Sequence, residues 1–253
     1  MSRLFERMAV LANQTEPGTP LGSDPLVRVI DFEATGLEDD ALVVEVGYTD
    51  LWTRSRVIGE TSSYLCRVPA MPPATRAVHH IRAEETAAFP PYDRRCLYEQ
   101  AVRDRVWGFA AHSAEFEAKF MIGNLPLLCT NKAALRHWPD APGHSVFALL
   151  YWLEDQGRVE YDRERAFPPH RAGPDSYATA VLLAAMLSEG VSGRTLYEWT
   201  CEPRIFPTCP IGQFRGRPWS ECDWGFLEWI LRKIDDPEIR FNASLEIERR
   251  QQQ

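Results

Sequence analysis

The sequence predicts an α/β protein with a mixed central sheet flanked by helices, because strand-like segments come first and then alternate with helix-like segments. The first strand is expected at residues 26–33, an apolar run that ends in the turn Thr35-Gly36. Proline-rich segments at 71–73 and 89–91 bracket a helical stretch. The remaining apolar patterns predict strands at 41–50, 63–68 and 106–111, and helices at 115–122, 145–155 and 176–187.

The chain is expected to have three parts. Residues 1–24 are rich in proline, glycine and polar residues without periodicity, which predicts a disordered tail. Residues 25–192 contain the predicted sheet and its helices. Residues 193–253 are expected to form a small α+β accessory module, with a hairpin at 210–218 followed by a helix at 225–234.

Composition excludes several classes of protein. No apolar run approaches the ~20 residues needed to span a bilayer, so neither a membrane protein nor a membrane partner is expected. The six cysteines are scattered without a C-x-x-C pair, which argues against a structural zinc site and a disulfide framework. These features are typical of a cytoplasmic protein. The sequence does not indicate the oligomeric state.

The net charge of −8 limits the possible nucleic-acid partners. Proteins that coat DNA through bulk electrostatics are usually basic, because neutralised phosphates supply much of their affinity. An acidic protein can still act on nucleic acid if its carboxylates bind metal ions and the metal ions contact the phosphates. The composition therefore argues against a broad DNA-coating surface and leaves a nuclease possible.

The pair Asp31 and Glu33 is the first candidate for chemistry. In a strand, residues two positions apart point to the same face, so these carboxylates emerge side by side. Adjacent carboxylates repel each other unless a cation lies between them. The alternative is a solvated strand end without a function.

Three further candidates follow along the chain. Glu117 lies on the helix predicted after the strand 106–111, and Asp175 lies in the first turn of an apolar helix. His170, in the preceding loop, could titrate near neutral pH and act as a base. Taken singly, Glu117 could be a surface residue, Asp175 a helix-capping residue and His170 a solvated histidine. Their order and spacing together favour one site.

These motifs resemble the DEDDh branch of the proofreading-type (DnaQ-like) 3′–5′ exonucleases. The resemblance covers about residues 26–190 and rests on Asp31-Phe-Glu-Ala-Thr-Gly-Leu37, Val44-Glu-Val-Gly47, Ala111-His-Ser-Ala-Glu-Phe-Glu117 and His170-Arg-Ala-Gly-Pro-Asp175. Segments 128–130, 135–139, 210–217 and 226–230 are similar to the exodeoxyribonuclease X subgroup, which carries a C-terminal accessory module.

The resemblance implies a ribonuclease-H-like exonuclease fold and a two-metal reaction. The implied metal ligands are Asp31, Glu33, Glu117 and Asp175, and His170 is the implied general base. Glu117 departs from the family pattern, which usually has Asp there, so this ligand is one methylene longer. Carboxylate ligands favour Mg²⁺ or Mn²⁺ over zinc. The expected reaction removes 5′-mononucleotides from a nucleic-acid 3′ end, and DNA is preferred to RNA by the subgroup resemblance. The implied substrate-binding residues are Thr35, Gly36, Leu37, His79, Ile81 and His112.

The accessory module offers a second group of candidates. Arg204, Arg215 and Arg217 lie in a stretch without acidic residues, close in sequence to Phe206, Phe214 and Trp219. Arginines and aromatic residues together can hold a single strand, so Arg215 and Arg217 are expected to contact substrate. The alternative is that the aromatic residues form the core of the module and the arginines are solvated.

Two other functions remain open at the level of sequence. One is an RNA-trimming, oligoribonuclease-like exonuclease, since no residue recognises a 2′-hydroxyl group decisively. The other is a non-catalytic nucleic-acid-binding protein on the same fold. The acidic set argues against the latter, because a binding module has no need of four clustered carboxylates.

Overall fold

The computed structural model describes residues 24–252, which contain a five-stranded mixed sheet of order β3-β2-β1-β4-β5. Strands β1 (Leu26–Ala34), β2 (Val43–Trp52) and β3 (Val57–Leu65) are antiparallel neighbours. Strands β4 (Gly108–Ala111) and β5 (Leu127–Cys129) continue the sheet parallel to β1. The predicted α/β class with a mixed sheet is confirmed. The tail predicted for residues 1–24 lies outside the described residues, apart from Asp24.

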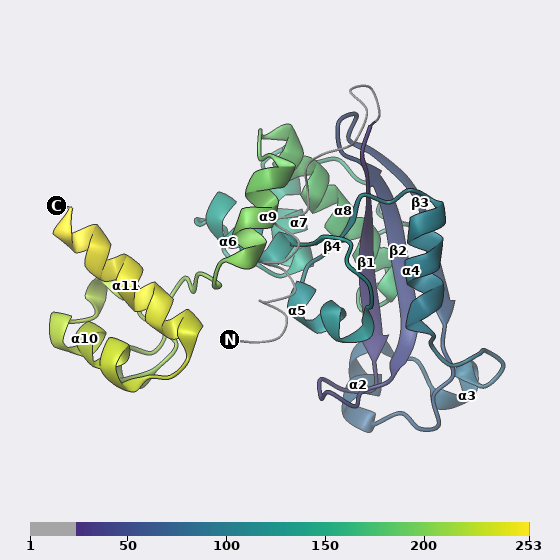
Figure 1. The fold of residues 1–253 in the computed structure, drawn as a ribbon, viewed down its shortest axis with the longest axis horizontal. Helices are drawn as coiled ribbons and strands as arrows, with labels where there is room; N and C mark the ends of the chain where they lie inside the picture. The colour runs from purple at the N-terminus through teal and green to yellow at the C-terminus, as the bar shows by residue number, and fades with distance from the viewer. Residues whose placement is uncertain (1–23, 253) are drawn as a thin grey trace. The chain divides into compact units, whose positions relative to one another are not determined.

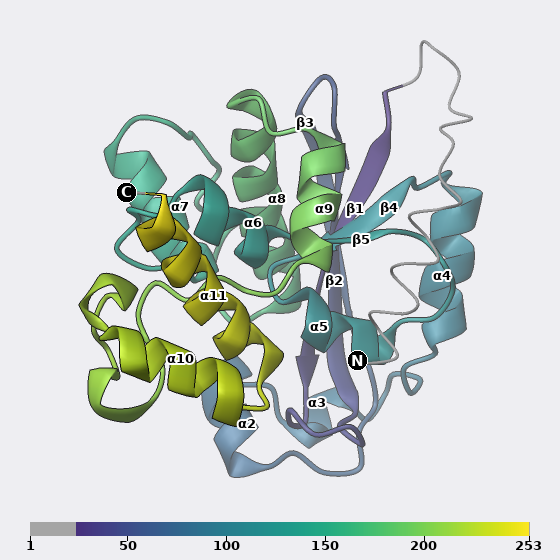
Figure 2. The ribbon, with the colours of Figure 1, turned by 60° about the vertical axis from the view of Figure 1, so that its left-hand side comes forward.

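Helices cover both faces of this sheet (Figure 1). Helix α4 (Arg94–Arg103) packs on the face that carries Ile30 and Phe32, where Leu97 joins their apolar core. Helix α8 (Ala172–Ser188) crosses β1, β2 and β3 on the other face. Helix α7 (Val146–Asp155) packs against α8, and α9 (Gly193–Cys201) packs against β5 (Figure 2). Alternate residues of β1 therefore face two different helical layers.

Several elements differ from the sequence-based expectation. The third strand begins at Val57, earlier than the predicted 63–68. The helix predicted at 115–122 consists of the short α5 (Ala114–Glu117) and the 3₁₀ turn η1 (Ala118–Phe120). Between the proline-rich segments lie two helices, α2 (Pro73–His79) and α3 (Ala83–Thr86), because His80 takes a left-handed conformation with φ 60° that ends α2.

The described chain divides into two compact units. The larger unit runs through Asn131 and resumes over Ala141–Cys201, so it ends later than the limit predicted at residue 192. The smaller unit combines Lys132–Asp140 with Glu202–Gln253. Most of helix α6 (Thr130–His137) belongs to the smaller unit. None of the helices in the described part of the chain has the length and apolar character needed to cross a membrane.

The smaller unit has its own apolar core. Its main helices are α10 (Trp224–Lys233) and α11 (Pro237–Gln251), each begun by an aspartate that accepts backbone N–H bonds, Asp223 and Asp236 respectively. The 3₁₀ turns η2 (Gly212–Phe214) and η3 (Trp219–Glu221) precede them. The buried core residues are Cys209, Trp219, Cys222, Leu227, Ile230, Ile239 and Ala243.

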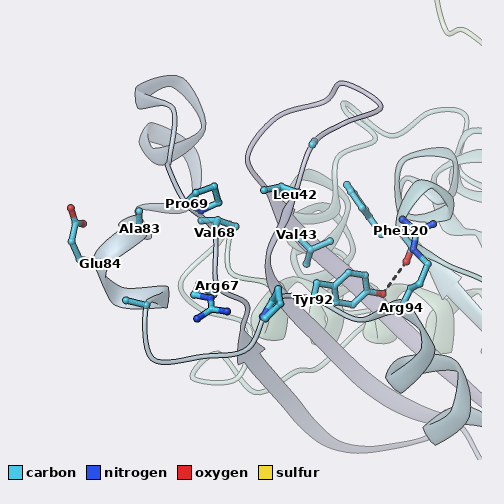
Figure 3. Close-up of a pocket in the computed structure, with 13 residues that line it drawn as sticks. Leu42, Val43, Arg67, Val68, Pro69, Ala83, Glu84, Tyr92, Arg94 and Phe120 are labelled. Carbon is cyan, nitrogen blue, oxygen red and sulfur yellow. Dashed lines mark hydrogen bonds between the residues drawn. The ribbon is translucent and has the colours of Figure 1, made fainter.

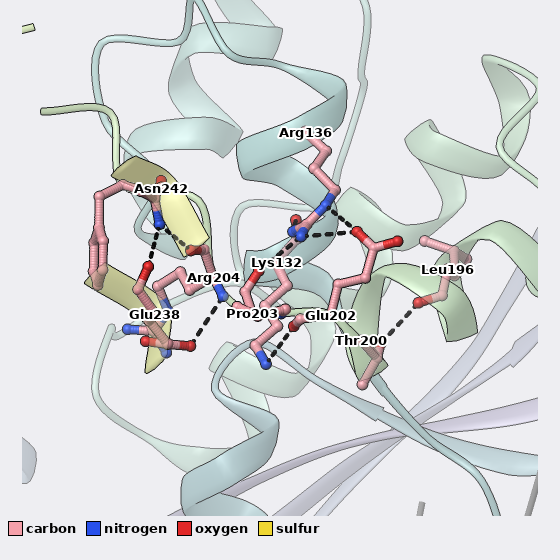
Figure 4. Close-up of polar contacts among 10 residues, drawn as sticks. Lys132, Arg136, Leu196, Thr200, Glu202, Pro203, Arg204, Glu238 and Asn242 are labelled. Atoms are coloured by element: carbon pink, nitrogen blue, oxygen red, sulfur yellow. Dashed lines mark hydrogen bonds and ion pairs between the residues drawn. The ribbon is translucent and has the colours of Figure 1, made fainter. Parts of the chain in front are cut away.

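Polar contacts fix the segments of the smaller unit to one another (Figure 4). Arg136 donates to the carbonyl of Pro203 at 2.7 Å and forms an ion pair with Glu202 at 3.0 Å. The Asn242 side chain accepts from the backbone N–H of Phe206 at 2.8 Å and donates to the carbonyl of Arg204 at 2.7 Å. The segment that follows Glu202 is thus held by side chains of α6 and α11.

The hairpin predicted at 210–218 is a loop, and the described part of this unit is helical without strands, which corrects the predicted α+β module. Gly212 and Gly216 have φ angles of 63° and 79°, which turn the chain tightly. The loop closes through bonds from Gly216 N–H to the Cys209 carbonyl and from Cys209 N–H to the Arg217 carbonyl, both 2.8 Å. A compact turn replaces the hairpin because Pro210 and Pro218 supply no N–H for a ladder.

Candidate active site

Asp31 and Glu33 lie on one face of β1, as their spacing predicts, and Phe32 between them faces the opposite layer. The Phe32 ring packs edge-on against Tyr92 and Phe120, with ring centroids 5.6 and 5.5 Å apart. Burial of Phe32 therefore fixes the rotation of the strand. It follows that the two carboxylates must point towards the face covered by α8.

The first turn of α8 brings Asp175 to the same place. Carboxylate oxygens of Asp31, Glu33 and Asp175 all lie within 4.8 Å of one another, which is a spacing that a metal ion could bridge. Asp175 also accepts from the backbone N–H of His170, at 3.2 Å to each oxygen. His170 has a left-handed φ of 59°, an uncommon conformation for a residue with a side chain. Its imidazole is exposed, so the site holds His170 through its backbone.

Glu117 reaches this cluster from α5. Its side chain is 3% exposed, and its Oε2 atom has no hydrogen-bond partner within residues 24–252. A buried carboxylate oxygen without a donor is costly, since most buried polar atoms in proteins are paired. The Glu117 carboxylate is close enough to raise the pKa of Asp31 by charge repulsion. Glu117 is not among the carboxylates whose oxygens lie within 4.8 Å of one another, so it borders the close cluster formed by β1 and α8.

Glu45 on β2 is a fifth acidic residue, and no local pattern in the sequence distinguishes it from the other residues of its motif. It lies opposite Glu33 in the strand register, is 2% exposed, and receives two hydrogen bonds from Arg171 at 2.8 and 2.9 Å. Its Oε2 atom also accepts the backbone N–H of Ala172 at 3.1 Å. Because no side chain of α8 itself caps that helix, Glu45 supplies the cap from a neighbouring strand.

Gly47 allows this close approach between β2 and α8. An added Cβ at Gly47 would overlap the backbone carbonyl group of Ala172. The Val44-Glu-Val-Gly47 motif therefore needs a glycine at its end so that α8 can pack closely on β2. This close packing also determines how near Asp175 lies to the sheet.

Burial and mutual repulsion raise the pKa of every carboxyl group in the cluster. Burial is the larger cause for Asp31, whose pKa is well above its ordinary value, with Glu117 and Asp175 adding repulsion. Burial, together with the charges of Asp175 and Glu45, raises the pKa of Glu33 to about 8. The pKa of Glu117 rises to about 8 and that of Asp175 to about 7, again mainly through burial.

These properties fit a divalent metal site. The donors are all carboxylate oxygens, which are the preferred ligands of Mg²⁺ and Mn²⁺. One buried oxygen, Oε2 of Glu117, lacks a partner among the residues the structure covers, and a cation would supply one. A bound cation would also offset the repulsion that otherwise makes these groups take up protons near neutral pH.

The predicted substrate residues Thr35, Gly36 and Leu37 follow directly after β1. Thr35 pairs with Leu42 across the loop, through its backbone N–H and its hydroxyl group, both at 2.9 Å. The Leu37 side chain is 74% exposed, and its carbonyl accepts from Lys119. The loop is therefore held at its base and by Lys119, while an apolar side chain projects into solvent.

Two other predicted residues, His79 and Ile81, are buried at the end of α2. The backbone N–H of Ile81 donates to Nδ1 of His79 at 3.0 Å, which assigns the ring proton to Nε2. This Nε2 atom is buried and has no acceptor among the described residues. Burial lowers the pKa of His79 below its ordinary value, and the negative charge of Glu45 acts in the opposite direction.

His112, Arg215 and Arg217 have different surroundings. His112 contacts the Thr130 hydroxyl group at 2.9 Å and the His144 carbonyl at 2.7 Å, which engages both ring nitrogens within the larger unit. A scaffolding role fits these contacts better than substrate binding. Arg215 and Arg217 are exposed in the loop of the smaller unit, where Arg217 lies 4.0 Å from Glu221.

A cavity of about 650 Å³ in the larger unit is separate from the acidic cluster (Figure 3). Tyr92 and Phe120 form part of its wall, joined by a 2.9 Å bond from the Tyr92 hydroxyl group to the Phe120 carbonyl. Both rings pack on Phe32, on the side of β1 that faces away from Asp31 and Glu33. No member of the carboxylate cluster lines this cavity.

Comparison with known proteins relates this arrangement to one class of nuclease. No protein-family model matches the sequence, and no curated protein matches it either. Among solved structures, exonuclease X in complex with 5′-overhanging duplex DNA matches at 27% identity and a TM-score of 0.53, covering 69% of this chain and 99% of its own.

Two other solved structures have the same fold at lower identity. The nuclease domain of 3′hExo, a DEDDh family member bound to rAMP, is 15% identical with a TM-score of 0.53, over 67% of this chain and 94% of its own. A 3′-exonuclease that recognises the histone mRNA stem-loop is 15% identical with a TM-score of 0.50, over 67% of this chain and 84% of its own. This chain is therefore a structural relative of the DEDDh 3′–5′ exonucleases and has their ribonuclease-H-like fold.

Proposed function

We propose that this protein is a metal-dependent 3′–5′ exonuclease that removes 5′-mononucleotides from the 3′ end of DNA. The convergence of Asp31, Glu33 and Asp175 in one partly buried cluster, with the buried Glu117 carboxylate beside it, carries the proposal. Keeping these repelling carboxyl groups together lowers stability unless a bound cation compensates, so a purely structural role explains the arrangement poorly.

The four carboxylates would hold two divalent cations, Mg²⁺ or Mn²⁺. When bound, such a pair supplies Lewis-acid stabilisation for the attacking and departing oxygens of an in-line displacement. Glu117 has one methylene more than the aspartate usual in the DEDDh exonucleases. Its Oε2 atom, which has no hydrogen-bond partner among the described residues, is the oxygen that a cation would engage.

His170 is proposed as the general base. A water molecule attacks the last phosphodiester phosphorus, the bond to the 3′ oxygen of the penultimate nucleotide breaks, and His170 accepts the proton from the water. The backbone contact with Asp175 keeps His170 beside the cluster, while the residue itself is exposed to solvent. Its strained φ of 59° supports a functional reason for this conformation.

The terminal nucleotide is proposed to lie against Thr35, Gly36 and Leu37, with His79 and Ile81 nearby. Leu37 offers an exposed apolar side chain that a base can contact. The buried Nε2–H of His79 has no acceptor in the described structure, and a substrate oxygen would satisfy it.

DNA is favoured as the substrate by the similarity to exonuclease X, the match with the highest identity among those described above. RNA is the alternative, since the other two structures contain rAMP or recognise an mRNA stem-loop. A non-catalytic binding protein is a third possibility, which an activity test would separate from the first two.

The test uses DNA and RNA oligonucleotides of one sequence, labelled at the 5′ end, with Mg²⁺, Mn²⁺ or a chelator. We expect a metal-dependent ladder that shortens from the 3′ end and appears faster on DNA. Asp31→Asn should reduce the rate by roughly a hundredfold or more, since even residues that only support metal ligands are worth roughly 10- to 100-fold.

Asp39→Asn is the matched control, because the Asp39 side chain is 99% exposed and its ion pair with Lys119, at 3.3 Å, lies at the surface. It should keep full activity. A faster ladder on RNA would move the proposal to an exoribonuclease. Absence of any ladder with either metal would favour the binding-protein alternative.

A further inference from the structure

Three aromatic side chains of the smaller unit are in contact with one another: Phe214 and Phe226, which are partly buried and pack against its core, and the exposed Trp229. The Phe214 and Phe226 rings lie 4.9 Å apart, and the Trp229 indole stacks on Phe226 with an interplanar angle of 23° and a centroid distance of 5.5 Å. Trp229 is 41% exposed. This exposure is unfavourable, because a tryptophan side chain has a large apolar surface that is usually buried in the folded protein. By contrast, Trp219 is buried, and its Nε1 donates to the Phe206 carbonyl at 2.9 Å.

These contacts divide the aromatic residues of the unit into two sets. Trp219 belongs to the buried core, so it is not the stacking residue that the sequence suggested, and Phe206 packs against that core. Phe214, Phe226 and Trp229 form the second set, which we call the aromatic row; its two phenylalanines also pack against the core, and Trp229 is its exposed member. The Phe226 ring lies directly over Gly212, where a Cβ would contact it, so the loop geometry fixes the ring. A rigid ring is a good base for stacking because little conformational entropy is lost on binding.

Two cations lie at the ends of this row. Lys233 is four positions after Trp229 in α10 and so lies on the same side of the helix, and Arg215 directly follows Phe214. Both are exposed, and neither has an acidic partner among the residues described. The nearby acids are engaged, because Glu228 accepts from the Trp224 indole at 3.0 Å and lies 3.7 Å from Arg232. Asp223 and Asp236 cap α10 and α11.

We propose that the aromatic row, with Arg215 and Lys233, binds single-stranded nucleic acid outside the acidic site. Bases would stack on Trp229 and continue the Phe226–Trp229 stack, while the two cations contact phosphates. This inference extends the proposed nuclease function by giving the strand a second site. Arg215 and Lys233 are only two cations, so stacking supplies most of the affinity and the salt dependence is modest.

The test measures binding of a labelled single-stranded oligonucleotide to the full chain carrying Asp31→Asn, which prevents degradation. Trp229→Ala should weaken binding by about tenfold, within the range known for one base–aromatic stack. Trp229→Phe keeps a ring and should restore most of the affinity. Combined Arg215→Gln and Lys233→Gln should weaken binding and reduce its dependence on salt concentration.

Trp224→Ala is the matched control. Trp224 lies in the same helix and is 42% exposed, but its indole is bonded to Glu228 and is not part of the aromatic row. It should leave the affinity unchanged. Equal affinities for Trp229→Ala and Trp224→Ala would overturn the proposal, and a protein partner would then be the better occupant of this surface.

A dinucleotide substrate separates this proposal from the nuclease function, because it has no nucleotides beyond the two that flank the cleaved bond. With Asp31 intact, Trp229→Ala should cleave a dinucleotide at the unmodified rate and raise KM only for longer strands. If Trp229→Ala slows dinucleotide cleavage as well, the aromatic row is not a separate binding site. If no variant cleaves any substrate, the nuclease proposal fails while the binding comparison still decides this one.

Discussion

At the residue scale, the acidic cluster behaves as a group of proton-binding sites when no cation is present. Asp175 and Glu33 have pKa values of about 7 and about 8, against ordinary values of 3.8 and 4.5. The folded protein therefore holds protons at a pH where the unfolded chain has released them. Divalent cations and protons should compete for the same oxygens.

This competition predicts how stability depends on pH in the metal-free protein. The pKa values of these carboxyl groups are higher in the folded protein than in the unfolded chain. Their protonation therefore contributes stability that is fully present below about pH 4 and is lost as the pH rises to about 8. The melting temperature measured with chelator should therefore fall across this range, and less steeply with Mg²⁺ or Mn²⁺ present. Asp31→Asn should also flatten the profile, because it removes one repelling charge. A metal-free melting temperature that stays constant from pH 5 to about 8 would contradict the proposed electrostatics.

The sequence could identify part of this cluster from local rules. Asp31 and Glu33 follow from the two-residue period of a strand. Glu117 and Asp175 required the family resemblance, because their approach to β1 depends on how α5 and α8 cross the sheet. Glu45 was recognised only as part of a motif, since its partner Arg171 is far away in the sequence and no local pattern links the two.

At the element scale, the N-terminus of α8 is the part of the scaffold that positions Asp175. Glu45 caps it through Arg171 and Ala172, and Gly47 lets its backbone approach β2. These contacts join residues over a hundred positions apart, and they determine whether Asp175 reaches the carboxylates of β1.

Glu45→Gln should lower the free energy of unfolding by about 2 kcal/mol, because hydrogen bonds to charged groups contribute roughly 1.5–3 kcal/mol. Arg171 is partly exposed and can turn to water, which limits the loss. Urea unfolding measures the change, and activity should fall in parallel because Asp175 is displaced. Asp39→Asn, which removes an exposed charge, serves as the comparison. An unchanged unfolding midpoint for Glu45→Gln would remove Glu45 from this role.

Gly47→Ala and Gly193→Ala should have opposite outcomes. At Gly47 the new methyl group meets the Ala172 backbone, which cannot move aside as a side chain can, so the cost should be about 1–3 kcal/mol or more. At Gly193, in the first turn of α9, no atom lies within 4 Å and alanine favours the helix. Thermal melting of both variants tests this, and similar melting temperatures for the two would show that α8 is not tightly seated on β2.

At the scale of the whole molecule, the class of fold and its resemblance to DEDDh exonucleases could be predicted, because alternating patterns and several motifs agree over a long stretch. The short β5 and the helix α11 were not predicted. β5 has only three residues, too few for a periodic signal, and α11 has apolar residues too dispersed to form a clear stripe. The segment expected to form a hairpin in the smaller unit is a loop. The prediction was wrong because it relied on glycine and proline, which are common in loops as well as in hairpins.

Binding of Mn²⁺ measured by calorimetry near neutral pH tests the central claim, that the four carboxylates form a metal site, most directly. About two ions per chain should bind, with release of protons from the cluster, and Asp31→Asn should abolish or strongly weaken binding. Glu117→Gln should weaken it as well, whereas Asp39→Asn should bind normally. Absence of Mn²⁺ binding by the unmodified protein, or equal binding by Asp31→Asn, would contradict the account.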